Sequence, residues 1–234
     1  MFIVTGISRG LGYAVVEQLL ANNEVVLGIG RSNPFGHKIK MLSCDLSNPE
    51  EIESLQFDFG DEEVTLINNA GILGEIGRIS AQEESDLVHV MQVNVFAPMA
   101  LTQKIYSSLD NKSKFTLVNI SSGAANRSIP SWGAYCASKA ALNRLTENFY
   151  LEEQELGNAL NVYAVAPGVI DTGMQAQIRE APESEFSSFA KFIQMKNDDD
   201  LFSATEAAKR LIKLLGVEYK GNSIYFDLRE VEVK

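Results

Sequence analysis

A tyrosine and a lysine four residues apart, Tyr135 and Lys139, form the pair in this sequence with the clearest chemical potential. They lie in the run from 132 to 145, which is rich in Ala and Leu and contains no proline, so it favours a helix. Residues four apart share one helix face, so we expect the phenol hydroxyl and the ammonium to point into the same space. An ammonium beside a phenol stabilises the phenolate and lowers its pKa from about 10. The pair is suited to proton transfer between a carbonyl and an alcohol, although this spacing is also common in surface pairs.

The elements that must position this pair alternate between strand and helix. Short apolar runs bounded by glycine or polar residues predict strands at 2–5, 25–30, 38–42, 64–67, 115–120, 160–166 and 222–227. Helical patterns lie between them, and the pattern from 86 to 110 is predicted to be interrupted near Pro98. No linker, repeat or low-complexity segment divides the 234 residues. We therefore expect a single α/β domain over 1–234, with one parallel sheet covered by helices on both faces.

Glycine-rich and polar segments follow the ends of the predicted strands. Gly6, Gly10 and Gly12 lie between the first strand and a helix, where backbone N–H groups and a helix N-terminus are able to hold a phosphate. Their spacing differs from the GxGxxG fingerprint, so the loop alone is also compatible with a turn that binds nothing. Further segments of this kind are 30–31, 45–46, 68–71, 121–122 and 167–172. Because ligands collect at the carboxyl ends of such strands, this convergence predicts a nucleotide site.

The end of the second predicted strand bears on the choice of nucleotide. An acid at this place selects NAD by binding the ribose hydroxyls, but here the sequence has Gly30 and Arg31. Arg31, and Arg9 in the glycine loop, supply guanidinium groups for a 2′-phosphate. Either arginine is alternatively a solvated surface group. Two arginines without a carboxylate favour NADP.

Composition excludes several other classes of function. The formal net charge of −11 opposes binding to nucleic acid or to an anionic membrane. Two cysteines, Cys44 and Cys136, make no disulfide framework and fit a reducing compartment. The only histidines, His37 and His89, have no metal-ligand spacing, so we expect no metal site. Neither a signal peptide nor a long apolar segment is visible, and the expected location is the cytoplasm.

Taken in order, these motifs resemble the short-chain dehydrogenase/reductase family over essentially the whole chain. They are Thr5-Gly-x-x-x-Gly-x-Gly12, Asn68-Asn-Ala-Gly71, Asn94 in an apolar helix, a serine ahead of Tyr135-x-x-x-Lys139, and Pro167-Gly-x-x-Asp-Thr172. The resemblance implies a Rossmann-type, doubly wound parallel sheet of about seven strands with helices on both faces. It also implies a nicotinamide cofactor, a small-molecule carbonyl substrate, and a homodimer or homotetramer.

The resemblance also implies residue roles. Tyr135 is the general acid, Lys139 lowers its pKa and holds the nicotinamide ribose, and Asn94 supports a proton-relay water. The family's serine-to-tyrosine spacing selects Ser122 over Ser121 as the catalytic serine. From the sequence itself, Asn94 is also able simply to bridge buried backbone. The cofactor-binding residues implied are Gly6, Ser8, Arg9, Leu11, Arg31, Ser32, Asp45, Leu46, Asn69, Ala70, Gly71, Tyr135, Lys139, Pro167, Gly168, Ile170 and Thr172.

Within the family, the segments around 121–124, 132–142 and 167–175 look most like benzil reductases and sepiapterin reductases. Both use NADPH to reduce a carbonyl, often one of two adjacent carbonyls. Sepiapterin reductases carry a pterin-binding aspartate in the last strand, where this chain has Tyr225, with Asp227 nearby but out of step. The resemblance therefore implies a benzil-reductase-like NADPH carbonyl reductase. The alternatives are a pterin reductase, an NAD-dependent alcohol dehydrogenase, and an NAD(P)-sensing binding protein without turnover.

The segment 173–197 is predicted to pass over the nicotinamide end of the site as a mobile apolar lid. Its apolar residues are alternatively ordinary packing at helical spacing. The candidate substrate-binding residues are Ser122, Trp132, Tyr135 and Met174, with Trp132 as a second wall. The apolar residues of the segment are Met174, Ile178, Phe186, Phe189, Phe192, Ile193 and Met195.

Overall fold

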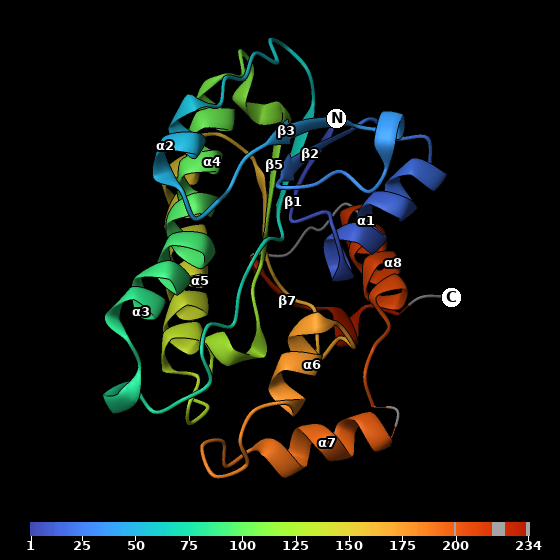
Figure 1. Ribbon diagram of the computed structural model, residues 1–234. Coiled ribbons are helices and arrows are strands. Elements are labelled where there is room, and N and C mark those ends of the chain that lie inside the picture. Colours follow the sequence, from blue (N-terminus) through green and yellow to red (C-terminus); the bar gives the residue numbers. More distant parts are fainter. Residues whose placement is uncertain (199, 217–222, 233–234) are drawn as a thin grey trace.

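The sheet of this protein is parallel throughout and doubly wound. The computed structural model describes residues 1–198, 200–216 and 223–232. Within that part of the chain, seven strands pair in the order β3-β2-β1-β4-β5-β6-β7 (Figure 1). The chain fills one half of the sheet before returning to fill the other, so the order reverses between β1 and β4. The strands are β1 Phe2–Thr5, β2 Val26–Gly30, β3 Lys40–Ser43, β4 Val64–Asn68, β5 Phe115–Ile120, β6 Asn161–Ala166 and β7 Tyr225–Asp227.

Helices cover both faces of this sheet (Figure 1). Helices α1 (Gly10–Ala21) and α8 (Ala204–Leu215) pack on one face around a core that includes Val4. Helices α2 (Pro49–Ser54), α4 (Ala97–Ser107) and α5 (Gly133–Glu155) pack on the other face, around a core that includes Ile3. Successive strand residues face opposite cores, which explains why the strands are apolar along their whole length.

The predicted helix from 86 to 110 is interrupted near Pro98, as expected, although Pro98 itself lies outside the irregular turn. Helix α3 (Glu84–Met91) passes into a single π-helical turn, Gln92–Phe96, and α4 follows directly. Pro98 lies in the first turn of α4, where its missing N–H leaves no helical hydrogen bond unmade. The wide turn instead surrounds Asn94, which is completely buried. Turns of this kind often mark functional sites.

The segment after β6 forms two helices, α6 (Gly173–Arg179) and α7 (Phe189–Asn197). Both lie at the carboxyl end of the sheet, beyond the end of β6 (Figure 1). A one-residue parallel bridge between Ile170 and Phe202 joins the two ends of this segment. Phe202 N donates to Val169 O at 3.0 Å, and Phe202 O accepts from Asp171 N at 2.9 Å.

The predicted elements and the structure agree closely. All seven predicted strands are present, and most bounds differ by one or two residues. The last strand begins later than predicted, at Tyr225, and Asn222 lies outside the described residues. No helix in the described ranges is both long and apolar enough to cross a bilayer. Short helical turns lie at Gly36–Lys38, Ile79–Ala81, Lys112–Lys114, Gly123–Ala125 and Leu228–Glu230.

Candidate active site

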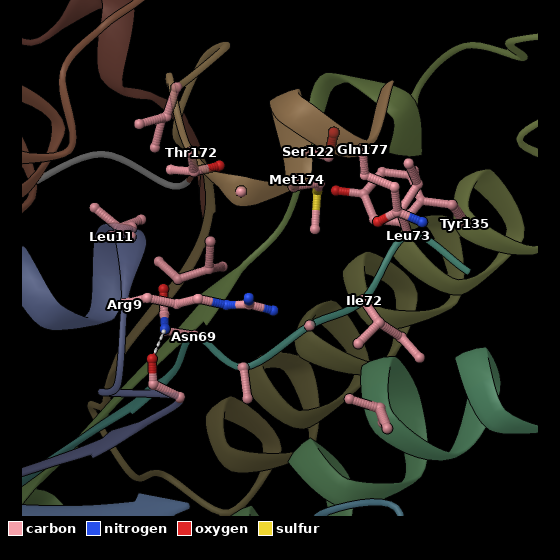
Figure 2. Close-up of a pocket in the computed structure, with 18 of the residues that line it drawn as sticks. Arg9, Leu11, Asn69, Ile72, Leu73, Ser122, Tyr135, Thr172, Met174 and Gln177 are labelled. Carbon is pink, nitrogen blue, oxygen red and sulfur yellow. Dashed lines mark hydrogen bonds between the residues drawn. The ribbon is translucent and has the colours of Figure 1, made fainter. Parts of the chain in front are cut away.

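A cavity of about 450 Å³ opens at the carboxyl ends of the strands. It is lined by every cofactor and substrate residue predicted from the sequence. Of the predicted catalytic residues, Ser122, Tyr135 and Lys139 line it, whereas Asn94 is buried and does not. Figure 2 shows Arg9 and Asn69 on one side of the cavity and Ser122, Tyr135 and Met174 on the other.

The glycine loop is shaped by close backbone approach. Gly6 has a φ of +69°, and a Cβ there would stand 2.9 Å from Ala70 Cα. A Cβ at Gly12 would stand 2.4 Å from both the Asn69 side chain and Gly6 O. Thr5 Oγ1 accepts hydrogen bonds from the backbone N–H groups of Asn69 (3.0 Å) and Ala70 (2.9 Å), which joins this loop to the end of β4. Side chains at these glycines would close the space.

The donors of this loop fit the phosphates of a dinucleotide. Helix α1 begins at Gly10, and its N-terminus has no side-chain cap and no acidic residue in the first turn. The first N–H groups of a helix have no partner within the helix, and its dipole favours an anion at that end. Because Gly10, Leu11 and the preceding Arg9 line the cavity, a bound pyrophosphate would be satisfied by this terminus.

Tyr135 and Lys139 lie on one face of α5, as predicted, and both are buried. Lys139 Nζ lies 5.9 Å from the centre of the Tyr135 ring and donates a hydrogen bond to Ile120 O at 2.8 Å. Ser122 forms a side-chain hydrogen bond with Tyr135. Neighbouring Ser121 is turned away and donates instead to Asn143 Oδ1 at 2.5 Å. Of the two serines, Ser122 is therefore the one in contact with the phenol.

The pKa of Tyr135 differs from the sequence-based expectation. Burial raises it above its ordinary value, and the hydrogen bond from Ser122 opposes this rise only in part. Burial also lowers the pKa of Lys139 to about 8. The net shift is therefore opposite to the sequence-based expectation, whereas the contribution of Lys139, whose ammonium donates to Ile120 O, stays a prediction.

Asn94 ties the end of β4 to α5. Its Oδ1 accepts from Ile72 N at 2.9 Å, and its Nδ2 donates to Ile72 O at 2.8 Å and to Ser138 Oγ at 3.0 Å. A Cβ at Gly71 would stand 3.3 Å from Asn94 Oδ1 and 3.4 Å from Lys139 Nζ, so these two atoms share one neighbourhood. The sequence left two roles open for Asn94, a bridge between backbone groups and support of a water. The structure shows the first of these roles directly.

Where the adenosine was predicted to bind, at the ends of β2 and β3, an acid lies beside the arginine. The end of β2 has no acid, but Asp45 from the end of β3 lies beside it, with its Oδ2 3.8 Å from Arg31 Nη1. The prediction of arginines without a carboxylate is therefore wrong, because neighbouring parallel strands place their ends side by side. Hydrogen bonds from Ser47 lower the pKa of Asp45, so this carboxylate is ionised. The side chain of Arg31 is 78% exposed, so the pair is weak and leaves the guanidinium available.

Sequence reasoning missed the polar side chains of α6. Gln177 lines the cavity, and its Nε2 donates across it to Gly74 O at 2.9 Å. Gln175 also lines the cavity and is buried. A spacing signal was available for Gln177, which lies three residues after Met174 and so shares its helix face, but not for Gln175. Other lining residues that were not predicted include Ile72, Leu73, Val169 and Ile178.

An aromatic cluster forms the wall of the cavity beside Tyr135. Trp132 stands edge-to-face against Tyr135, with ring centres 5.7 Å apart. From the segment 173–197, Phe186 stacks on Trp132 at 5.6 Å and Phe192 packs against it at 5.2 Å. The apolar residues of the predicted lid are thus largely packed on the wall of the site, as the packing interpretation expects, and the interpretation as a mobile lid stays a prediction.

Comparison with known proteins identifies the class to which this fold and site belong. The family model described as short chain dehydrogenase matches residues 1–183, and the chain belongs to this family of nicotinamide-dependent oxidoreductases. A benzil reductase of the (S)-benzoin-forming type from Bacillus cereus is 34% identical, over 92% of this chain and 94% of its own length. A sepiapterin reductase from Rattus norvegicus is 28% identical, over 91% of this chain and 90% of its own.

Solved structures agree with this assignment. The crystal structure of YIR035C, a short-chain dehydrogenase/reductase from Saccharomyces cerevisiae, superposes with a TM-score of 0.84. The two chains are 26% identical, and the match covers 98% of this chain and 96% of the other. The resemblance predicted from sequence motifs is therefore confirmed at the level of family and fold.

Proposed function

We propose that the protein reduces a carbonyl compound with NADPH, and that its substrates include aromatic ketones and diketones of the benzil type. The observation that carries this proposal is the buried Tyr135 hydroxyl, which is hydrogen bonded to Ser122 in a cavity whose opposite side carries the glycine loop. The aromatic wall around Trp132 supports an apolar, flat substrate. Similarity to benzil reductases over nearly the whole chain supports the same substrate class.

When bound, NADPH would supply the hydride that the carbonyl carbon receives, and the residues of this chain would bind it and handle the proton. Tyr135 gives its hydroxyl proton to the carbonyl oxygen, and Ser122 donates a second hydrogen bond to the same oxygen. The raised pKa of Tyr135 keeps the phenol protonated at neutral pH, which is the form that a general acid requires. As the proton leaves, the cation of Lys139 stabilises the phenolate from across the ring.

The remaining residues bind the cofactor or hold the catalytic side chains in position. Asn94 fixes Ile72 and Ser138 beside Lys139, and in this proposal it supports the water through which Tyr135 regains its proton. Arg9 and Arg31 bind the 2′-phosphate, and Lys139 holds the nicotinamide ribose. The rest of the cofactor contacts fall to the lining residues Gly6, Ser8, Leu11, Ser32, Asp45, Leu46, Asn69, Ala70, Gly71, Pro167, Gly168, Ile170 and Thr172.

NADPH oxidation measured with a panel of diketones, aldehydes and pterins tests this function. We expect turnover with aromatic diketones to exceed turnover with pterins. Asp227 is held by Arg229, whose Nε donates to its Oδ1 at 2.9 Å, and it does not line the cavity, which disfavours a pterin substrate. NADPH binding without oxidation of any compound would instead favour the alternative of a sensing protein. A homodimer or homotetramer, a cytoplasmic location and a single domain over 1–234 stay predictions.

The first testable prediction concerns the choice of cofactor. The unmodified protein should prefer NADPH over NADH in kcat/KM, and Arg31→Ala should reduce that preference by about tenfold or more. The physical reason is that hydrogen bonds between charged groups contribute roughly 1.5–3 kcal/mol each. Arg144→Ala is the matched control, because this exposed arginine pairs with Glu147 and does not line the cavity. Equal use of NADPH and NADH by the unmodified protein would reject the assignment.

The second prediction concerns the apolar wall. Met174→Ala and Trp132→Ala should each raise KM for aromatic diketones more than for small aldehydes, because only the larger substrates fill the space beside these side chains. Met99→Ala is the control, since Met99 is exposed on α4 and lies outside the cavity. If both wall variants kept the parent's ranking of substrates, the wall would have no part in selection.

A further inference from the structure

Trp132 carries a hydrogen-bond donor that nothing in the described structure uses. It is the one tryptophan of the chain and is 6% exposed. Its Nε1 is closed to solvent and has no hydrogen-bond partner among the described residues. An indole N–H is able only to donate, and buried donors in proteins are nearly always paired. Leaving one unpaired destabilises the folded state, so this group calls for an explanation.

The position of Trp132 relative to the reacting group is well defined. Its ring centre lies 5.7 Å from that of Tyr135, in an edge-to-face arrangement. Trp132 and Tyr135 both line the cavity. The unpaired N–H therefore belongs to Trp132, whose ring packs directly against the ring of the proposed proton donor, on the side of the site where we propose that the substrate binds.

The backbone around Trp132 is held firmly. Ser131 has a φ of +70°, a region that non-glycine residues rarely occupy. Its Oγ donates to Glu185 O at 2.5 Å, and its carbonyl accepts from Gly77 N at 3.1 Å. Trp132 O accepts from Cys136 N at 2.8 Å in the first turn of α5. Such contacts on both sides fix the place from which the indole projects.

Two aromatic rings from one segment enclose the indole. Phe186 and Phe192, which pack on its ring at 5.6 and 5.2 Å, both belong to the segment 173–197. The segment is held at its ends by the bridge between Ile170 and Phe202, and within it Glu185 O accepts from Ser131 Oγ. A substrate entering beside Phe192, which itself lines the cavity, would displace these rings from the indole edge.

We propose that Trp132 Nε1 donates a hydrogen bond to a second oxygen of the substrate, on the carbon next to the reacting carbonyl. The proposal rests on the carbonyl reductase function above and narrows its substrate class to vicinal dicarbonyl compounds. In such a compound the two oxygens lie on adjacent carbons. When one oxygen accepts from Tyr135 and Ser122, the other lies on the neighbouring carbon, and the donor nearest to it in our proposal is on the ring packed against Tyr135. An isolated ketone leaves the indole N–H unpaired.

The kinetic test compares two substrates that differ by one oxygen. Benzil and deoxybenzoin share both phenyl rings and one carbonyl, but only benzil has the second. Trp132→Phe keeps an aromatic ring and removes the N–H. It should lower kcat/KM for benzil about threefold to tenfold, the loss expected for one neutral hydrogen bond, and change that for deoxybenzoin by less than about twofold. Phe186→Leu alters the packing without removing a donor and should change both substrates alike.

The spectroscopic test uses the unmodified protein, because a single tryptophan gives a single indole N–H resonance. In the presence of NADP⁺, which donates no hydride, benzil should move this proton resonance downfield and deoxybenzoin should not. Equal losses for both substrates in Trp132→Phe, or equal shifts with both ligands, would overturn the role of Trp132 and leave the reductase function intact. Failure of the unmodified protein to reduce either compound would overturn the proposed function itself.

Discussion

Tyr135→Phe should lower turnover by about 10²–10⁴, the contribution expected of a positioned general acid. The substitution keeps the ring, and therefore the packing against Trp132, while it removes the proton that the carbonyl oxygen must receive. Affinity for NADPH should change little, because the glycine loop, Arg9 and Lys139 are untouched. Steady-state rates and cofactor titration measure the two effects separately.

Tyr163→Phe is a suitable control for this variant. Tyr163 is as buried as Tyr135, but it lies in β6, packs against Phe226 and does not line the cavity. Removing the hydroxyl of Tyr163 should leave turnover close to that of the unmodified protein. Near-normal turnover in Tyr135→Phe would remove the general-acid role from this residue and, with it, the proposed mechanism.

Lys139→Met should abolish efficient turnover and weaken cofactor binding, yet raise the stability of the folded protein. Burial lowers the pKa of Lys139 from 10.5 to about 8. At 1.36 kcal/mol per unit, this shift corresponds to about 3 kcal/mol of destabilisation by the buried charge. Losing the hydrogen bond to Ile120 O offsets about 1 kcal/mol of the gain. The net increase in the free energy of unfolding at pH 7 should be about 2 kcal/mol.

The sign of this effect depends on pH in a defined way. Below about pH 8 the lysine is protonated in both the folded and unfolded chains, so the full penalty applies. Between about pH 8 and 10.5 the folded protein sheds the proton first and the penalty disappears. The gain from Lys139→Met should therefore be present at pH 7 and absent at pH 10. Denaturant unfolding at both values measures it, with exposed Lys209→Met as the control, and a variant less stable than the parent at pH 7 would contradict it.

Features that depend on local pattern were predictable from the sequence. Strand β5 was predicted with the bounds that the structure shows. A short apolar run between polar residues, in a chain that alternates strands and helices, is best buried as a strand of a parallel sheet. The faces of α5 followed from the spacing of Tyr135 and Lys139 alone. Nearly all predicted ligand-binding residues line one cavity, because parallel strands deliver their carboxyl ends to one edge.

Features that depend on contact between distant segments were not predictable in this way. Asp45 lies beside Arg31 only because β2 and β3 are neighbouring strands, and the residues of neither segment predict that the two strands pair. The wide turn around Asn94 arises from its bonds to Ile72 and Ser138, which lie on two other segments. The raised pKa of Tyr135 reflects the depth of burial, a property of the whole fold rather than of a motif.

The bridge between Ile170 and Phe202 has a consequence for how such a chain is able to diversify. It fastens the two ends of the intervening segment to each other, whatever the length or composition of the residues between them. Extending a closed loop is inexpensive, at about 0.6 kcal/mol for each doubling of its length. We therefore expect that residues between these two ends are able to vary while α5 and the glycine loop keep their places at the cavity. Differences in substrate choice between related chains are then expected to arise in this segment rather than in the residues proposed to carry the reaction.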